Sequence, residues 1–223
     1  MIRRAASVFA VLVLLAGCGG AAGEGEGTAQ LWVTRDRGAK LLVDTKVNAG
    51  QTLMRALASE TDVKTRYGGR YVQAVNGIEG SLSAQRDWFW FVNGYEGDRS
   101  AASYRLHDGD VAWLDYRGWE REGEARVVVG AFPEPFLHGY DGKMRAAAVR
   151  FEGSPERARR LGRRIGADSI EPLGTPAPAG ANVLELRDGQ NGATAELLGE
   201  NAGDPVRLVL SGDPVLTRRF EVR

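Results

Sequence analysis

The sequence predicts an α+β protein built mainly from short strands. Three observations indicate this class. Apolar runs of strand length recur along the chain, the turn pairs Asn76-Gly77 and Asn93-Gly94 each follow one of these runs, and helical patterns are confined to residues 51–60 and 154–165. Hydrophobic residues make up 43% and charged residues 26% of the 223 residues, which excludes collagen-like and wholly disordered classes.

The N-terminal residues 1–17 have the layout of a secretory signal peptide. Arg3 and Arg4 precede an apolar run over Val8–Leu15, and small residues follow it. The run is shorter than the roughly 18–20 apolar residues that a membrane-spanning helix needs. A buried core helix is the alternative interpretation, and it would not explain the arginines before the run.

The end of this segment, Leu15-Ala16-Gly17-Cys18, resembles the lipobox of bacterial lipoproteins. The resemblance implies that Cys18, the only cysteine, is acylated and becomes the first residue after cleavage. Two acyl chains would anchor the protein stably to the lipid bilayer. Residues 18–28 then form the lipidated cysteine and a Gly-rich flexible tether, and we expect a cell-membrane location facing the extracytoplasmic side.

Two folded segments are expected, over residues 29–120 and 124–223. All five tryptophans lie between Trp32 and Trp119, and none follows. The shift places a boundary in the polar stretch 118–124. Each segment is large enough for a small core.

The first segment is predicted to contain strands and one helix. Its turns are expected at 48–50, 76–77, 93–94 and 108–110, where Gly, Asn and Asp tolerate tight backbone geometry. The helix over 51–60 places Leu53, Met54 and Leu57 on one face. The strands are predicted over Gln30–Thr34, Leu41–Asp44, Tyr71–Val75, Asp87–Val92 and Val111–Tyr116.

The strand over Asp87–Val92 is apolar on both faces. Side chains alternate, so Trp88 and Trp90 point one way while Phe89 and Phe91 point the other. Such a strand is either central and buried, or it exposes an aromatic face that binds a flat apolar ligand or a partner. Trp113 is expected on the face used by Trp88 and Trp90.

Residues 41–119 resemble the transcobalamin-like C-terminal domain family of secreted bacterial proteins, related to the β-domain of transcobalamin and intrinsic factor. The matching stretches are Gln51-Thr52-Leu53 with Ala56-Leu57, Gly69, Tyr71–Ile78, Trp88–Gly94, Ser103–Leu106, Asp108-Gly109-Asp110 and Val111–Trp113. The resemblance implies a β-grasp-like sheet packed on one helix, which agrees with the strands and helix predicted above.

The same resemblance implies a ligand. In the animal relatives this domain caps cobalamin against a separate helical barrel, and this chain has no second segment helical enough to be that barrel. The resemblance suggests Trp88, Trp90, Asn93, Gly94 and Trp113 as ligand-binding residues, with cobalamin or another corrinoid as the candidate ligand.

The second segment is predicted to be a small α+β domain of unrecognised family. Ser154 is a good helix N-cap before Pro155, and the helix to about Ile165 carries five arginines that form either a solvated face or a surface for anionic lipid or a partner. A Pro/Gly/aromatic loop is expected over 132–143 and a linker-like turn over 173–180. The strands are predicted over Arg126–Ala131, Ala146–Phe151, Val183–Leu186, Ala193–Leu198, Val206–Leu210 and Phe220–Val222.

The residue inventory argues against catalysis and against nucleic acid as a partner. Lys plus Arg equals Asp plus Glu at 29 each, so no net positive charge attracts phosphate backbones. Two histidines and one cysteine cannot build a Cys/His zinc site, and we expect no catalytic or metal residues. His107 is expected in an exposed loop, and His138 in a structural loop.

These observations lead to two hypotheses. The first is a non-enzymatic, membrane-anchored lipoprotein that binds a small ligand for uptake and delivers it to a transporter. The alternative is a surface protein–protein interaction or envelope-scaffold module with no small ligand, in which the same aromatic side chains form the core.

Overall fold

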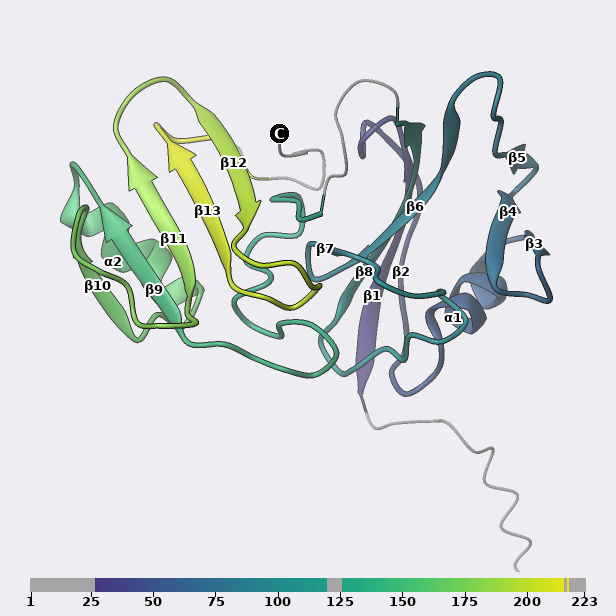
Figure 1. The fold of residues 1–223 in the computed structure, drawn as a ribbon, viewed down its shortest axis with the longest axis horizontal. Helices are drawn as coiled ribbons and strands as arrows, with labels where there is room; N and C mark the ends of the chain where they lie inside the picture. The colour runs from purple at the N-terminus through teal and green to yellow at the C-terminus, as the bar shows by residue number, and fades with distance from the viewer. Residues whose placement is uncertain (1–26, 120–125, 215, 217–223) are drawn as a thin grey trace, which may run out of the picture.

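The computed structural model describes residues 27–119, 126–214 and 216. The predicted signal peptide, Cys18, nearly all of the tether, most of the 118–124 boundary and the strand expected over Phe220–Val222 lie outside the described residues. Within them, the chain forms three β-sheets and two helices (Figure 1), so the predicted α+β class is confirmed. The strands and helices of the described residues lie between Thr28 and Ser211.

The first half of the chain contains two sheets and one helix. Its elements are β1 (Thr28–Arg35), β2 (Lys40–Asn48), α1 (Leu53–Glu60), β3 (Val63–Arg66), β4 (Tyr71–Val75), β5 (Ile78–Glu79), β6 (Arg86–Val92), β7 (Tyr95–Glu96) and β8 (Val111–Gly118). The main sheet has the order β2-β1-β8-β6-β7, and its central pair, β1 and β8, is parallel. Strands β3, β4 and β5 form a smaller antiparallel sheet beside it.

Helix α1 begins two residues later than predicted because Thr52 caps it. The Thr52 hydroxyl accepts a hydrogen bond from the Arg55 amide at 3.2 Å, which satisfies one of the free N–H groups of the first turn. Leu53, Ala56 and Leu57 are buried. The helix therefore packs its apolar face inward, as the sequence periodicity predicts.

The second half forms a five-stranded sheet with one helix. Its elements are β9 (Ala147–Phe151), α2 (Pro155–Arg164), β10 (Ser169–Pro172), β11 (Asn182–Arg187), β12 (Gly192–Leu197) and β13 (Val206–Ser211). The order is β10-β9-β11-β13-β12, and only the β12–β13 pair is antiparallel. Helix α2 connects the parallel neighbours β9 and β10, since parallel strands need a crossover connection.

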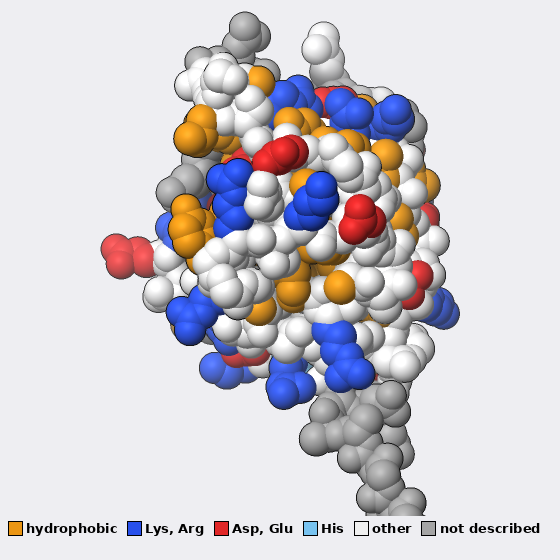
Figure 2. Space-filling view, turned by 90° about the vertical axis from the view of Figure 1, so that its right-hand side faces the viewer, with side chains coloured by type: hydrophobic (Ala, Val, Ile, Leu, Met, Phe, Trp, Pro, Cys, Tyr) orange, Lys and Arg blue, Asp and Glu red, His pale blue; other side chains and the backbone are white. Residues whose placement is uncertain are grey.

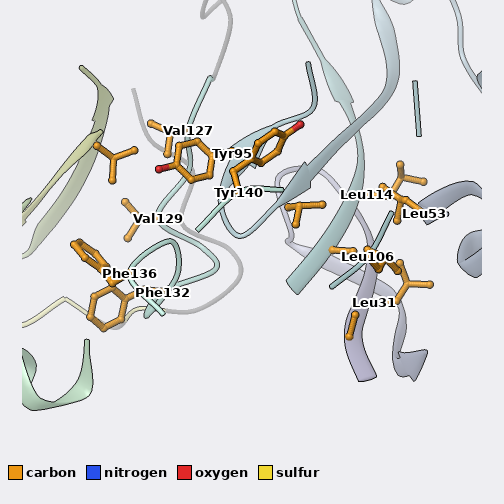
Figure 3. Packing of buried hydrophobic residues seen from close by; sticks show 14 of the residues in the cluster. Leu31, Leu53, Tyr95, Leu106, Leu114, Val127, Val129, Phe132, Phe136 and Tyr140 are labelled. Carbon is orange, nitrogen blue, oxygen red and sulfur yellow. The ribbon is translucent and has the colours of Figure 1, made fainter. Parts of the chain in front are cut away.

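The predicted strand over Arg126–Ala131 is wrong. This segment makes an isolated bridge between Val127 and Tyr95, and its backbone pairs with the turn at the end of β6: the Val128 amide donates to the Gly94 carbonyl at 2.8 Å. The valines are buried because the segment lies between the two large sheets (Figure 3). The apolar, β-branched composition of this segment is therefore explained by its burial and not by pairing in a strand.

The buried side chains of both halves form one continuous cluster. It extends from Leu31 and Leu53 through Tyr95 and Tyr140 to Phe136 beside the second sheet (Figure 3). A smaller cluster of Phe91, Trp113 and Val128 covers the other face of the first sheet. The segment 126–143 therefore contributes buried side chains to both clusters.

Candidate functional site

An apolar hollow lies in the first half of the chain, where β6 faces the start of β4 and the loop 97–101. Its volume is about 660 Å³, within the range of small-molecule sites. The lining residues are Arg70, Tyr71, Val72, Leu82, Asp87, Trp88, Phe89, Trp90, Glu96, Gly97, Arg99, Ser100, Ala101, Leu114 and Trp119. We call this hollow the β6 pocket.

Trp88 forms a fixed part of the pocket floor. Its side chain is only 6% exposed, and its indole N–H donates to the Ile78 carbonyl at 2.9 Å. The ring also packs against Tyr116, with 5.3 Å between the ring centroids. The indole is therefore held in one orientation by backbone of the small sheet and by the neighbouring strand β8.

Trp90 is half-buried and presents part of its indole to the pocket. One neighbour is Tyr104, at 5.5 Å between ring centroids. Another is Gly97, where an added Cβ would lie 2.0 Å from the indole carbon Cζ2. Only glycine leaves room for the ring there, so Gly97 sets the depth of the pocket.

The rim of the pocket carries exposed apolar side chains. Leu82 is 84% exposed and Tyr71 39% exposed, and Tyr67 at the β3–β4 turn packs edge-on against Tyr71 at 6.1 Å. On the end of the molecule formed by β3, β4, β5 and α1, hydrophobic side chains reach the surface among Lys and Arg side chains (Figure 2). Burial, together with the hydrogen bond to Asp87, raises the pKa of Tyr71 to about 12, so its hydroxyl remains a donor at neutral pH.

The charged groups of the lining balance. Two arginines, Arg70 and Arg99, face two acidic residues, Asp87 and Glu96. Arg99 is neutralised further by Asp98 at 2.8 Å and Asp141 at 3.3 Å. An apolar floor with balanced charges at its edge suits a largely apolar, uncharged body better than a polyanion.

Asn93 and Gly94 lie away from the pocket. Asn93 has 0% exposure, and its side-chain amide donates to Asp110 at 2.7 Å and to the Gly139 carbonyl at 2.8 Å. Gly94 has a positive φ of 86°, and an added Cβ would lie 2.7 Å from the Val128 carbonyl oxygen. The Asn-Gly turn therefore joins the two halves of the chain.

Trp113 does not share a face with Trp88 and Trp90, so that prediction is wrong. The register pairs it with Phe91, at 6.0 Å between ring centroids, and it packs edge-on against Trp32 at 6.2 Å. Its indole N–H donates to the buried Thr34 hydroxyl at 2.7 Å. Side chains of directly paired residues point to the same side of a sheet, which places Trp113 with Phe91.

Sequence reasoning missed most of the pocket wall. Arg70 comes from the turn before β4, Tyr71 and Val72 from β4, and Leu114 from β8. The loop after β7 contributes Gly97, Arg99, Ser100 and Ala101. Each looks like an ordinary strand or loop residue in the sequence. Trp119 also lines the pocket, and nothing in the sequence places it beside the aromatic strand.

The described residues contain no group of three or more His, Cys, Asp or Glu side chains that could hold a metal ion. Each histidine instead pairs with a buried carboxylate: His138 Nδ1 lies 2.6 Å from Glu134, and His107 Nδ1 lies 3.5 Å from Asp110. Burial raises the pKa of both carboxyl groups. Within the described ranges, no helix has both the length and the apolar character needed to cross a bilayer.

Residues 50–118 match the family model of a domain of unknown function, DUF4430. Among curated proteins, no sequence matches the chain.

Two solved structures resemble part of the fold. A suggested metal-binding protein from Ruminococcus gnavus ATCC 29149 is 19% identical, with a TM-score of 0.34, over 42% of this chain and 99% of that one. Haptocorrin in complex with Cbi is 14% identical, with a TM-score of 0.36, over 42% of this chain and 25% of that one. Neither is named as an enzyme, and TM-scores below 0.5 fix neither the fold nor the function of this chain.

Proposed function

We propose that this protein is a non-enzymatic ligand-binding lipoprotein whose β6 pocket takes a small, largely apolar molecule with a flat face. The observation that carries the proposal is the pocket itself. It combines about 660 Å³ of volume with three tryptophans, Trp88, Trp90 and Trp119, and a charge-balanced edge. An aromatic floor offers a large rigid surface on which a planar molecule can stack.

The finer proposal is that the ligand is cobalamin or another corrinoid, taken up through a transporter. The sequence resemblance to transcobalamin-like domains supports it. The first sheet adds support, because its β1–β2 hairpin, the helix that follows and the parallel pair β1–β8 agree with the β-grasp-like sheet that the resemblance implies. The macrocycle would stack on Trp90, and its substituents would lie along the Tyr71–Leu82 rim.

The proposed location is the extracytoplasmic face of the cell membrane. The support is the sequence Leu15-Ala16-Gly17-Cys18 after an apolar segment. Acylation of Cys18 would keep the pocket close to the membrane, where a captured ligand meets its transporter. Mass spectrometry of the membrane fraction tests this point: diacylglycerol on Cys18 supports it, and an intact N-terminus in the soluble fraction contradicts it.

Ligand titration tests the pocket. The chain from Gly19 to Arg223 holds all the strands and helices of the described residues, and its tryptophan emission is followed as cobalamin or cobinamide is added. Inner-filter correction is needed because corrinoids absorb strongly, and calorimetry checks the affinity. We expect saturable binding.

Two variants separate the pocket from the rest of the sheet. Trp90→Ala removes the exposed part of the floor, whereas Trp32→Ala removes another half-buried tryptophan on the opposite face of the same sheet. We expect binding to weaken at least tenfold in Trp90→Ala and to change less than twofold in Trp32→Ala. Equal losses, or no binding by the unmodified chain at high micromolar corrinoid, would contradict the ligand proposal.

The second candidate is a protein-interaction module without a small ligand. The observation that favours it is the exposure of Leu82 and Tyr67, 84% and 78%, beside the pocket. A Leu82→Ser and Tyr67→Ser double variant should then lose partner capture by envelope proteins, and the unmodified chain should bind no corrinoid. Corrinoid binding that weakens in this double variant would instead assign the rim to the ligand.

A further inference from the structure

The outward face of α2 carries an unusual concentration of arginine. The ten residues Pro155–Arg164 include one acidic residue, Glu156. The basic residues are Arg157, Arg159, Arg160, Arg163 and Arg164. The chain as a whole has equal numbers of basic and acidic residues, so this helix is a local departure from a neutral protein.

The helix is held with this face outward. Ala158 and Gly162 are buried, and an added Cβ on Gly162 would lie 2.5 Å from the Ile170 side chain of β10. Close contact on the inner side leaves Arg159, Arg160, Arg163 and Arg164 exposed. Spacings of three and four residues place side chains on the same face of a helix, so these arginines form one stripe along the axis.

The stripe is only partly neutralised. Arg159 lies 3.8 Å from Glu156, and Arg164 lies over the Phe132 ring at 4.9 Å. Arg157, which is half-buried, donates to the Arg187 carbonyl at 3.4 Å, an uncharged acceptor. Within the described residues, no acidic side chain forms an ion pair with Arg160 or Arg163, so both guanidinium groups are available to an outside partner.

We propose that the α2 arginine stripe docks on the anionic phospholipid headgroups of a membrane. Guanidinium groups bind phosphate oxygens through paired hydrogen bonds, which a row of exposed arginines can repeat across a flat surface. The apolar side of α2 is used inside the protein, so the contact is electrostatic and involves no insertion. A long anionic polymer is less suitable as the partner, because it would need positive charge beyond α2. The chain as a whole has no net positive charge.

The short distance in sequence between Cys18 and the first strand fits a membrane as partner. Cys18 stands ten positions before Thr28, where β1 begins. A fully extended chain of that length spans about 35 Å, so an acylated Cys18 would keep the folded part near the bilayer. This link rests on the proposed lipid anchor, whereas headgroup binding by α2 is measurable without Cys18.

Vesicle sedimentation tests the proposal with the chain from Gly19 to Arg223, which cannot be acylated at Cys18. Vesicles of phosphatidylcholine alone are compared with vesicles in which a third of the lipid is phosphatidylglycerol. Each basic residue near an anionic surface strengthens binding about fivefold, so Arg160→Gln with Arg163→Gln should weaken binding to the mixed vesicles about 25-fold. Raising the salt concentration about tenfold should release the unmodified chain.

The matched control removes the same charge elsewhere. Arg66 forms an exposed ion pair with Glu79 on the small sheet, and Arg207 forms one with Glu196 between β13 and β12. Neither arginine is on α2, so Arg66→Gln with Arg207→Gln has the same net charge as the test variant. We expect less than a threefold effect from this control. Equal loss in both double variants, salt-independent binding, or equal binding to neutral and anionic vesicles would overturn the proposal. The α2 substitutions lie outside the β6 pocket, so corrinoid titration tests the ligand proposal independently of vesicle binding.

Discussion

Replacing Asn93 by alanine should destabilise the whole protein, although the residue lies in a two-residue turn. Its side chain satisfies three polar groups at once, two of them buried and the third, the Val111 amide, partly buried. The amide nitrogen donates to Asp110 and to the Gly139 carbonyl, and the amide oxygen accepts from the Val111 amide at 2.7 Å. Alanine would leave all three without that partner in a site with 0% exposure.

The magnitude follows from these contacts and from a matched turn elsewhere in the chain. A buried polar group that loses its partner costs about 1–3 kcal/mol, so two such groups and the partly buried Val111 amide should together cost about 3 kcal/mol. Asn76 also precedes a glycine, with φ of 48° against 52° at Asn93, but it is exposed, and its side chain accepts one hydrogen bond, from the Asp62 amide. Asn76→Ala therefore carries the same backbone strain without the buried contacts.

Urea unfolding followed by circular dichroism measures the two free energies of unfolding, and thermal unfolding gives the midpoints. We expect Asn93→Ala to be less stable than Asn76→Ala by about 3 kcal/mol, or about 6–12 °C in Tm for a chain of this size. A difference below about 1 kcal/mol would refute the reasoning, because Asn93 would then not connect the two halves energetically.

Three further outcomes are expected. Gly97→Ala should displace the Trp90 indole, since the new Cβ would lie 2.0 Å from it; tryptophan emission should shift and corrinoid affinity fall, and an unchanged emission spectrum would contradict this. Burial raises the pKa of Glu134 above its ordinary 4.5, so the folded protein binds this proton more tightly than the unfolded chain. Stability contributed by Glu134 should therefore fall as pH rises from 4.5 through the raised pKa, and Glu134→Gln should flatten the profile of Tm against pH; a slope like that of the unmodified protein would argue against it. Ser154→Ala removes the acceptor for the Arg157 amide at the start of α2 and should cost about 1 kcal/mol in urea unfolding, whereas no change would show that water replaces the cap.

Features set by neighbouring residues were predictable from the sequence. The Ser154 cap before Pro155 is one example, and the helix begins there. The turn at Asn93-Gly94 is another, with both residues at positive φ. The alternation along β6 correctly separated Trp88 from Phe91, because strand periodicity is a property of the local backbone.

Features set by distant residues were not predictable in the same way. The face of the sheet on which Trp113 lies depends on the register between β8 and β6, which pairs it with Phe91. No pattern within β8 reveals that register. The short strands β3, β5, β7 and β10 exist only because longer neighbours offer them hydrogen bonds. Their own sequences are too short or too polar to predict them.

The candidate site shows the same division. The sequence by itself determined that an aromatic strand exists and that Trp88 and Trp90 share one of its faces. Tertiary structure decided that this face borders a hollow closed by β4 and the loop 97–101, and that Asn93 is buried at the junction with the second half. A pocket is the space left between segments far apart in the chain, so its walls depend on long-range packing that local periodicity does not encode.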